Sequence, residues 1–383
     1  MHYTGYRMLV ILKSRNAEAA RNYFDQSLRM GDYYREGEQV VGRWHGQAAA
    51  RLGLTGDVTR KTFCALIDNR HPITGEQLTP RMKADRIPGF DFTWTAPKSI
   101  SVLYAMTGDE RITAAMRASV SDAMAEVERE MKTRVRGRGR DEDRVTGNCV
   151  WAEFLHHTAR PIDGISDPHL HIHSYVFNQT YCGVEKRWKA AQIGDLKGEA
   201  LYFEAVFHAA LAKRVAGLGY GIEHHGRFFE VAGLGLAMLD RFSRRRDVVE
   251  QAAVAEGSEH NPEAMRQLSR LTRERKVEEL TVDQLHDIWK ARLLPRERAQ
   301  LDKVVSLARH GLSPITKADA RWLMGVELGD ALRHESAVSE KSVLTRVLRR
   351  GFGALVSGDA RAAMELQGVL RGEVGGRKWI TTV

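Results

Sequence analysis

Several features that would assign this 383-residue chain to a common class are missing from it. No run of about 18 apolar residues is present, so we expect no membrane-spanning helix. Its three cysteines, Cys64, Cys149 and Cys182, are scattered and form no CxxC pair. They therefore predict a reducing, cytoplasmic setting without a disulfide framework. The GxxxxGK[ST] phosphate loop and internal repeats are also missing, which gives no sign of an NTPase in this chain.

The composition that is present indicates a basic globular protein. Hydrophobic residues make up 43% of the chain, which is enough for a core, and no low-complexity tract interrupts it. Lys and Arg number 58 against 49 Asp and Glu, for a net charge of +9. A polyanionic partner is favoured by this charge, with nucleic acid the leading candidate, although a basic protein without such a partner has the same balance.

The pattern of apolar residues predicts an α/β half followed by a helical half. Strands are expected at 8–12 and 90–95, and in "NCVWAEFLHHT" and "HLHIHSYVFN". Helices are expected in "NAEAARNYF", with Asn16 as N-cap, and over 112–131 and 202–218. The pattern from about 234 to 350 is almost entirely helical. Between these elements, "KTRVRGRGRDEDR" is interpreted as a basic, glycine-rich loop; it and "RFSRRR" could follow DNA phosphates or form solvated surfaces.

Histidines are concentrated in "DPHLHIHSYVFN", where His169, His171 and His173 alternate. Residues two apart in a strand share a face, so three imidazoles would lie together. A metal ion is a good partner for neutral imidazoles. "FLHHTAR" offers His156 or His157 from a neighbouring strand. Three histidines would leave coordination positions open, as metal-assisted chemistry on a phosphodiester requires, although HxH also occurs in sugar-binding barrels and oxidoreductases.

Tyrosines near the N-terminus offer a nucleophile. "ARNYFDQSLRMGDYY" contains Tyr23, Tyr33 and Tyr34 in a polar context. A phenol has a pKa of about 10, which a nearby cation lowers further. Taken alone, the three would be ordinary packing aromatics; beside a metal site in a basic protein they are candidates for phosphoryl transfer.

Five segments in order resemble the relaxase domain of the TrwC/TraI-type (MobF) conjugative relaxases, in the HUH endonuclease superfamily. They are "NYF…GDYY", "GRWHGQAAARLGL", "GFDFTWTAPKSISVLYAM", "FLHHTARPIDGISDPHLHIHSYVFN" and "LDRFSRRRDVVE". The resemblance covers about residues 8–310. It implies a two-layer α/β palm with an antiparallel five-stranded sheet at 8–233 and helical fingers at 234–310. Residues 311–383 would be a helical extension resembling the lead-in to a helicase part that is not in this chain, which is then a fragment or a naturally short version.

The resemblance also implies the site residues. Tyr23 would be the first nucleophile, Tyr33 or Tyr34 the second, and Asp91 the carboxylate that orients a ligand histidine or takes the tyrosine proton. Arg160 would lie near the scissile phosphate. The implied metal ligands are His156, His171 and His173, with His156 preferred to His157 because the strand reads F-x-H-x-T-x-R.

Three departures from the family pattern stand out. Phe24 replaces a second adjacent tyrosine, "PIDGIS" lengthens the gap between the histidine strands, and His169 replaces a residue that is usually not histidine. His169 could be a fourth metal contact or a DNA contact.

The implied activity is a metal-assisted transesterification on single-stranded and hairpin DNA at a transfer origin. Cleavage would leave a 5′-phosphotyrosine link, which is rejoined after transfer. Mg²⁺ or Mn²⁺ is the expected ion, with Zn, Ni or Co as alternatives. Accessory relaxosome proteins and a coupling protein are the expected partners, in the bacterial cytoplasm or, after transfer with the DNA, in the recipient cell. The rivals are a rolling-circle initiator, disfavoured because the tyrosines precede the histidines, a non-nuclease HxH metal enzyme, and a non-catalytic DNA-binding module.

Overall fold

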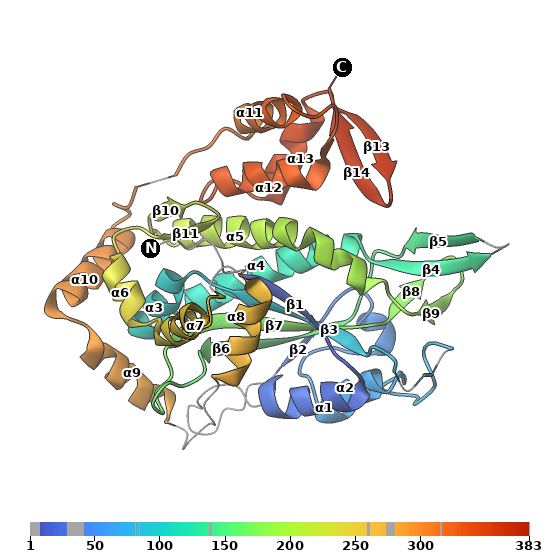
Figure 1. The fold of residues 1–383 in the computed structure, drawn as a ribbon, viewed down its shortest axis with the longest axis horizontal. Helices are drawn as coiled ribbons and strands as arrows, with labels where there is room; N and C mark the ends of the chain where they lie inside the picture. Colours follow the sequence, from blue (N-terminus) through green and yellow to red (C-terminus); the bar gives the residue numbers. More distant parts are fainter. Residues whose placement is uncertain are drawn as a thin grey trace.

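A five-stranded antiparallel sheet lies at the centre of the fold (Figure 1). The computed structural model describes residues 8–28, 42–80, 82–83, 85–137, 140–258, 261–272, 280–314 and 316–382. The strand order is β1-β3-β7-β6-β2. The strands are β1 (Leu9–Lys13), β2 (Arg43–His45), β3 (Gly89–Thr95), β6 (Trp151–Thr158) and β7 (Pro168–Phe177). The predicted palm sheet is confirmed.

Three helices cover one face of this sheet: α3 (Lys98–Thr107), α4 (Glu110–Arg129) and α5 (Ala200–Gly217). Figure 1 shows α4 and α5 running along that face, on the side opposite α1 and α2. The predicted alternation in β3 directs Phe90, Phe92 and Trp94 into this core. Leu170 and Ile172 of β7 lie in the same core, so the histidines between them face the other way.

The opposite face carries a second, smaller core beneath α1 (Ala17–Tyr23), its π-helical continuation Phe24–Leu28, and α2 (Arg60–Ile67). As predicted, Asn16 caps α1: its Oδ1 accepts from the Ala19 amide at 2.8 Å. Phe154 of β6 and Tyr175 of β7 belong to this aromatic cluster. This apolar packing anchors α1 beside the polar part of the same face.

The segment interpreted as a basic loop is a β-hairpin, so that prediction is wrong. It forms β4 (Lys132–Gly137) and β5 (Arg140–Val145). The register places Arg134 opposite Asp143 and Arg136 opposite Asp141. Opposite charges that face each other across two strands favour strand pairing. The glycines and arginines of this segment are instead typical of a loop, so the sequence pattern did not predict the strands.

The structure contains two further hairpins. β8 (Thr180–Cys182) pairs with β9 (Arg187–Lys189), and β10 (Ile222–His225) pairs with β11 (Phe228–Val231). Short 3₁₀ helices occur at Ala50–Leu52 and Ile193–Glu199.

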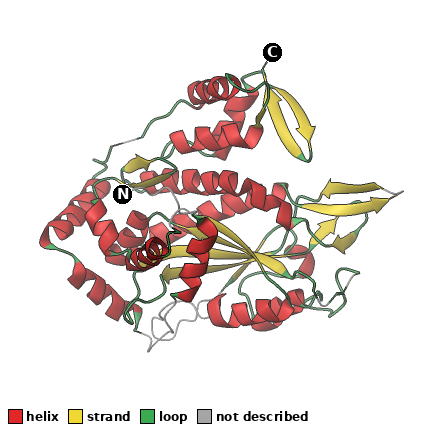
Figure 2. Ribbon diagram, viewed as in Figure 1, coloured by secondary structure: helices red, strands yellow, loops and turns green. Residues whose placement is uncertain are grey.

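The chain after β11 is mostly helical, as expected (Figure 2). The helices are α6 (Leu236–Arg241), α7 (Arg244–Ala255), α8 (Pro262–Leu271), α9 (Val282–Arg292) and α10 (Pro295–Arg309). Within the described ranges, no helix is both long and apolar enough to cross a bilayer. The division of the chain at 233 and 310 stays a prediction.

The extension is helical in part and adds a small sheet that the apolar pattern did not predict. Its elements are α11 (Ala320–Leu332), β12 (Val338–Ser339), α12 (Glu340–Arg350), α13 (Ser357–Glu365), β13 (Leu370–Val374) and β14 (Arg377–Thr381). The three strands form a sheet in the order β12-β14-β13. The extension rests on the helical side of the palm, with α12 alongside α5 (Figure 1).

Candidate active site

Strand pairing brings the candidate residues together on the face where α1 and α2 pack. In the register of β7, His171 lies opposite His156 of β6 and Thr95 of β3. His173 lies opposite Thr93, and the next pair on that face joins Asp91 to Tyr175. Directly paired residues share one face, so three neighbouring strands supply a single site.

Tyr23, the last residue of α1, is held at this site by hydrogen bonds. Its hydroxyl donates to Asp91 Oδ2 at 2.7 Å and lies 3.1 Å from His173 Nδ1. The same carboxylate oxygen accepts from Thr93 Oγ1 at 2.9 Å and from His173 Nδ1 at 2.8 Å. One oxygen of Asp91 therefore joins the tyrosine to a histidine of the cluster. Sequence reasoning missed Thr93, although its position two residues after Asp91 placed it on the same face.

The electrostatics of the site favour an ionised carboxylate at Asp91 and a neutral imidazole at His171. Burial by itself raises the pKa of Asp91, but His173 and the hydrogen bonds from His173, Tyr23 and Thr93 outweigh it, and the pKa lies below its usual range. For His171, burial and then the neighbouring histidines place the pKa well below its ordinary value. A neutral imidazole is the form that binds a metal ion.

The donor set fits a divalent metal ion. One ring nitrogen from each of His156, His171 and His173 lies within 4.8 Å of the others. His171 Nδ1 is 2.9 Å from the carbonyl oxygen of His169, and His173 Nδ1 donates to Asp91. With Nδ1 protonated in both rings, each Nε2 carries a lone pair that can bind a metal, a common arrangement around metal-binding histidines. Three protein ligands leave positions for external oxygens.

The two adjacent histidines of β6 point to opposite faces of the sheet. His156 joins the cluster, while His157 stacks on Tyr104 of α3, with ring centroids 5.1 Å apart. The ring of His169 lies 4.7 Å from that of His171 but outside the group of three. Arg160 lies two residues beyond β6, half-buried, and makes no hydrogen bond or ion pair with the described residues.

Phe24, the residue after the candidate nucleophile, is part of the apolar core. Its side chain is 1% exposed and stacks on Phe63 with centroids 4.2 Å apart. Position 24 therefore anchors the helix that carries Tyr23. Tyr33 and Tyr34, the candidates for the second nucleophile, lie outside the described residues.

The arginines of "RFSRRR" make bonds within the protein, and the suggestion that this run follows phosphates stays a prediction. Arg244 binds Asp167, and Arg245 donates to the carbonyls of Ser269 and Thr272. The other two pairs are Arg241–Glu297 and Arg246–Asp240. These bonds connect the run to other helices and to Asp167.

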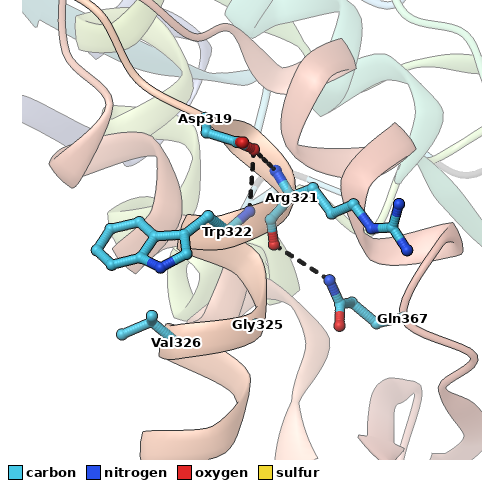
Figure 3. A pocket seen from close by; sticks show the side chains of 6 residues that line it. All are labelled: Asp319, Arg321, Trp322, Gly325, Val326 and Gln367. Atoms are coloured by element: carbon cyan, nitrogen blue, oxygen red, sulfur yellow. Dashed lines mark hydrogen bonds between the residues drawn. The ribbon is translucent and has the colours of Figure 1, made fainter.

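A cavity of about 500 Å³ lies in the extension, on elements other than the strands that carry the histidines. Figure 3 shows its lining, with Trp322 and Gln367 from the two sides. Its polar groups bond to one another: Asp319 Oδ1 accepts from the amides of Arg321 and Trp322, and Gln367 Nε2 donates to the Arg321 carbonyl. Nothing in this lining suggests catalysis.

The site combines a tyrosine hydroxyl bound to a buried carboxylate with three histidines on an antiparallel sheet. This combination is typical of metal-dependent enzymes that use a tyrosine nucleophile. Comparison with known proteins narrows this class. The TrwC relaxase family model matches residues 17–294, and this chain belongs to that family.

Relatives and solved structures agree with this assignment. The chain is 32% identical over 262 residues to the multifunctional conjugation protein TraI of Escherichia coli, and 31% identical over 261 residues to that of strain K12. Each match covers 66% of this chain, but the chain spans only 14% of the length of each relative.

Two solved structures show the same fold. The metal-bound conjugative relaxase TrwC in complex with oriT DNA superimposes with a TM-score of 0.65 and 26% identity, over 74% of this chain and 97% of that one. TrwC complexed with a 27-mer DNA comprising the recognition hairpin and the cleavage site gives a TM-score of 0.64 and 25% identity, over 74% and 97%.

Proposed function

We propose that this chain is a conjugative DNA relaxase, which nicks one strand of a transfer origin by tyrosine transesterification and rejoins it after transfer. The observation that carries the proposal is the Tyr23–Asp91–His173 hydrogen-bonded chain beside the histidine cluster. A rolling-circle initiator, which shares this chemistry, is the second candidate, but family membership favours the relaxase.

In the proposed reaction, the hydroxyl oxygen of Tyr23 attacks a phosphodiester of single-stranded DNA. The new bond joins the 5′ phosphate to the tyrosine, and the 3′ oxygen leaves with a proton. Asp91 Oδ2 holds the hydroxyl at 2.7 Å and also fixes His173 through its Nδ1–H. Because the pKa of Asp91 is lowered, it is a weak proton acceptor, and its main role is orientation.

A metal ion, when bound, would polarise the phosphate and offset the charge that develops on its oxygens. His156, His171 and His173 would hold it. We propose Mg²⁺ or Mn²⁺, which phosphate oxygens favour; the all-nitrogen protein ligands also suit Zn, Ni or Co. Arg160, which has no partner among the described residues, would face the scissile phosphate.

The remaining parts of the proposal concern substrates and setting. The DNA partner would be single-stranded and hairpin DNA at a transfer origin, the kind of ligand found with TrwC. Tyr33 or Tyr34 would act in the second strand transfer. We also propose the division into palm, fingers and extension. The proposed partners include accessory relaxosome proteins and a coupling protein. The proposed location is the cytoplasm, with passage to a recipient cell together with the DNA.

The test is a denaturing gel of the protein mixed with its cognate origin single strand and Mg²⁺ or Mn²⁺. A protein band carrying covalently bound DNA is expected, and it should disappear with EDTA and with Tyr23→Phe. Tyr181→Phe, on the remote β8 strand, is the matched control and should form the adduct normally. An adduct of undiminished yield with Tyr23→Phe would refute the assignment of this nucleophile.

A further inference from the structure

The connection between β6 and β7 is an ordered hairpin rather than an open loop. Ile162 and Ile165 exchange backbone hydrogen bonds of 3.0 and 3.1 Å around Asp163 and Gly164, which both have positive φ. This is the Asp-Gly signature of a two-residue hairpin turn. At the base of the hairpin, the Ala159 amide donates to the Asp167 carbonyl at 2.9 Å. The "PIDGIS" segment that departs from the family pattern therefore has a defined shape.

Helix α7 contacts this hairpin through one arginine. Arg244 donates to the carbonyls of Ile162 at 3.3 Å and Ile165 at 2.8 Å. Its backbone amide and Nε also donate to Asp167, at 3.0 and 3.1 Å. A single residue at the first position of α7 thus fixes both strands of the hairpin.

Helix α9 adds two contacts at the same place. Arg292 donates to Asp167 Oδ1 at 2.6 Å, and the indole of Trp289 donates to the Ser166 carbonyl at 2.8 Å. From α3, Lys98 donates to the Pro168 carbonyl at 2.8 Å and to the Phe242 carbonyl at 3.0 Å. Asp167 is 3% exposed, so its charge is balanced inside the protein by these basic groups.

The position of Asp167 connects this cluster to the proposed catalytic face. It immediately precedes β7, four residues before His171. The carbonyl of His169, between them, is the acceptor that sets the His171 tautomer. At the other end of the hairpin, Ala159 is bonded to Asp167 and is followed directly by Arg160. A shift of Asp167 would therefore move both the first turn of the ligand strand and Arg160.

We propose that Asp167 is a positioning residue for the relaxase reaction. Its ion pairs with Arg244 and Arg292 lock the helical fingers α7 and α9 to the histidine strand, and this holds Arg160 and the His169 carbonyl in register with the metal ligands. The inference rests on the proposed function. It extends that function by assigning a positioning role to Arg244, one arginine of that run.

Two variants weaken the ion pairs of Asp167 to different degrees. Arg292→Gln removes one ion pair and leaves Arg244 in place. Asp167→Asn keeps the side-chain shape but removes the charge. The matched control is Arg246→Gln, because Arg246 is ion-paired to Asp240 within the same helical region.

The first measurement needs no DNA cleavage. Titration of the full chain with Co²⁺, followed by its absorption bands, should show weaker binding in Asp167→Asn by about tenfold, since partners that orient metal ligands have effects of this size. Hydrogen exchange of the peptide covering 159–168 should be faster in both lock variants. The control should match the unmodified protein in both measurements.

The second measurement is single-turnover adduct formation against DNA concentration. Asp167→Asn should lower the maximal rate by at least about tenfold, with a smaller change in half-saturating DNA, because misplaced groups affect the chemical step more than binding. Arg292→Gln should fall between Asp167→Asn and the control. Failure of the unmodified protein to form an adduct would refute the proposed function. The metal-binding and hydrogen-exchange results would then still test whether Asp167 positions the hairpin.

Equal rates, metal affinity and exchange in Asp167→Asn and Arg246→Gln would overturn the inference. A lower melting temperature with unchanged maximal rate and metal binding would also overturn it, because that result describes a purely structural ion pair. Asp167→Glu, which restores the charge, should recover part of the rate if the charge is what positions the hairpin.

Discussion

The substitution Asp91→Asn tests the centre of the site most directly. Asp91 Oδ2 accepts hydrogen bonds from Tyr23, Thr93 and His173, between 2.7 and 2.9 Å. Asparagine keeps the shape but loses the charge, and its amide group would present donors toward groups that are themselves donors. Both the nucleophile and one metal ligand should therefore lose their fixed orientation.

The expected size of the effect follows from these two losses. Removing a partner that orients a metal ligand typically costs about 10–100-fold in affinity or activity. A misplaced nucleophile costs a further factor of about 10–100. The maximal cleavage rate should fall roughly 10²–10⁴-fold, or about 3–5 kcal/mol of barrier. Metal affinity should fall only by the first factor.

The assay is single-turnover formation of the protein–DNA adduct at saturating metal and DNA, with metal affinity measured separately. Thr93→Val is the graded companion, because it removes one donor to Asp91 and leaves the charge; it should cost much less. If Asp91→Asn cleaved within about threefold of the unmodified protein, the chain of hydrogen bonds could not be what positions the nucleophile.

Three further outcomes are expected. His156→Ala should abolish tight Mn²⁺ binding and His157→Ala should keep it, since only His156 joins the cluster. Calorimetric titration compares the two variants. Equal losses of affinity would contradict the register of β6 against β7. Phe24→Tyr should destabilise the fold by about 1–3 kcal/mol in urea unfolding, because its hydroxyl enters an apolar cluster, and it should not restore adduct formation to Tyr23→Phe. The pKa of Lys98 is lowered to about 8 by burial, so the folded state loses this proton before the unfolded state does. The unfolding free energy should thus rise by about 2.5 kcal/mol relative to Lys98→Met between pH 8 and pH 10.4. Parallel pH profiles of the two proteins would refute this.

Local sequence patterns predicted the parts of the site that depend on one strand or helix. Alternation placed His171 and His173 on one face, and Asn16 predicted the start of α1. The resemblance supplied the preference for His156 over His157. Spacing along the chain could not have decided it, because it depends on the register of β6 against β7.

What the sequence could not supply are partners that are distant along the chain. Arg244 binds Asp167, 77 residues earlier, so the basic run looked like an external surface. The hairpin of β4 and β5 was hidden because its stabilising pairs, such as Arg134 opposite Asp143, form only after the chain folds back. In the extension, "GEVGGRKW" carries two glycines at positive φ between β13 and β14, a signal typical of a hairpin turn.

The anchoring of α1 has a mechanical consequence. In the proposed reaction, a DNA strand that is being pulled away stays attached to Tyr23, so tension on that strand acts on the end of α1. The next residue, Phe24, is wedged between Phe63 and Phe154 in the aromatic core. Tension would be transmitted through the packing of Phe24 to the sheet and would not act on the histidines. The packing of Phe24 would thus hold the nucleophile helix against the sheet under load.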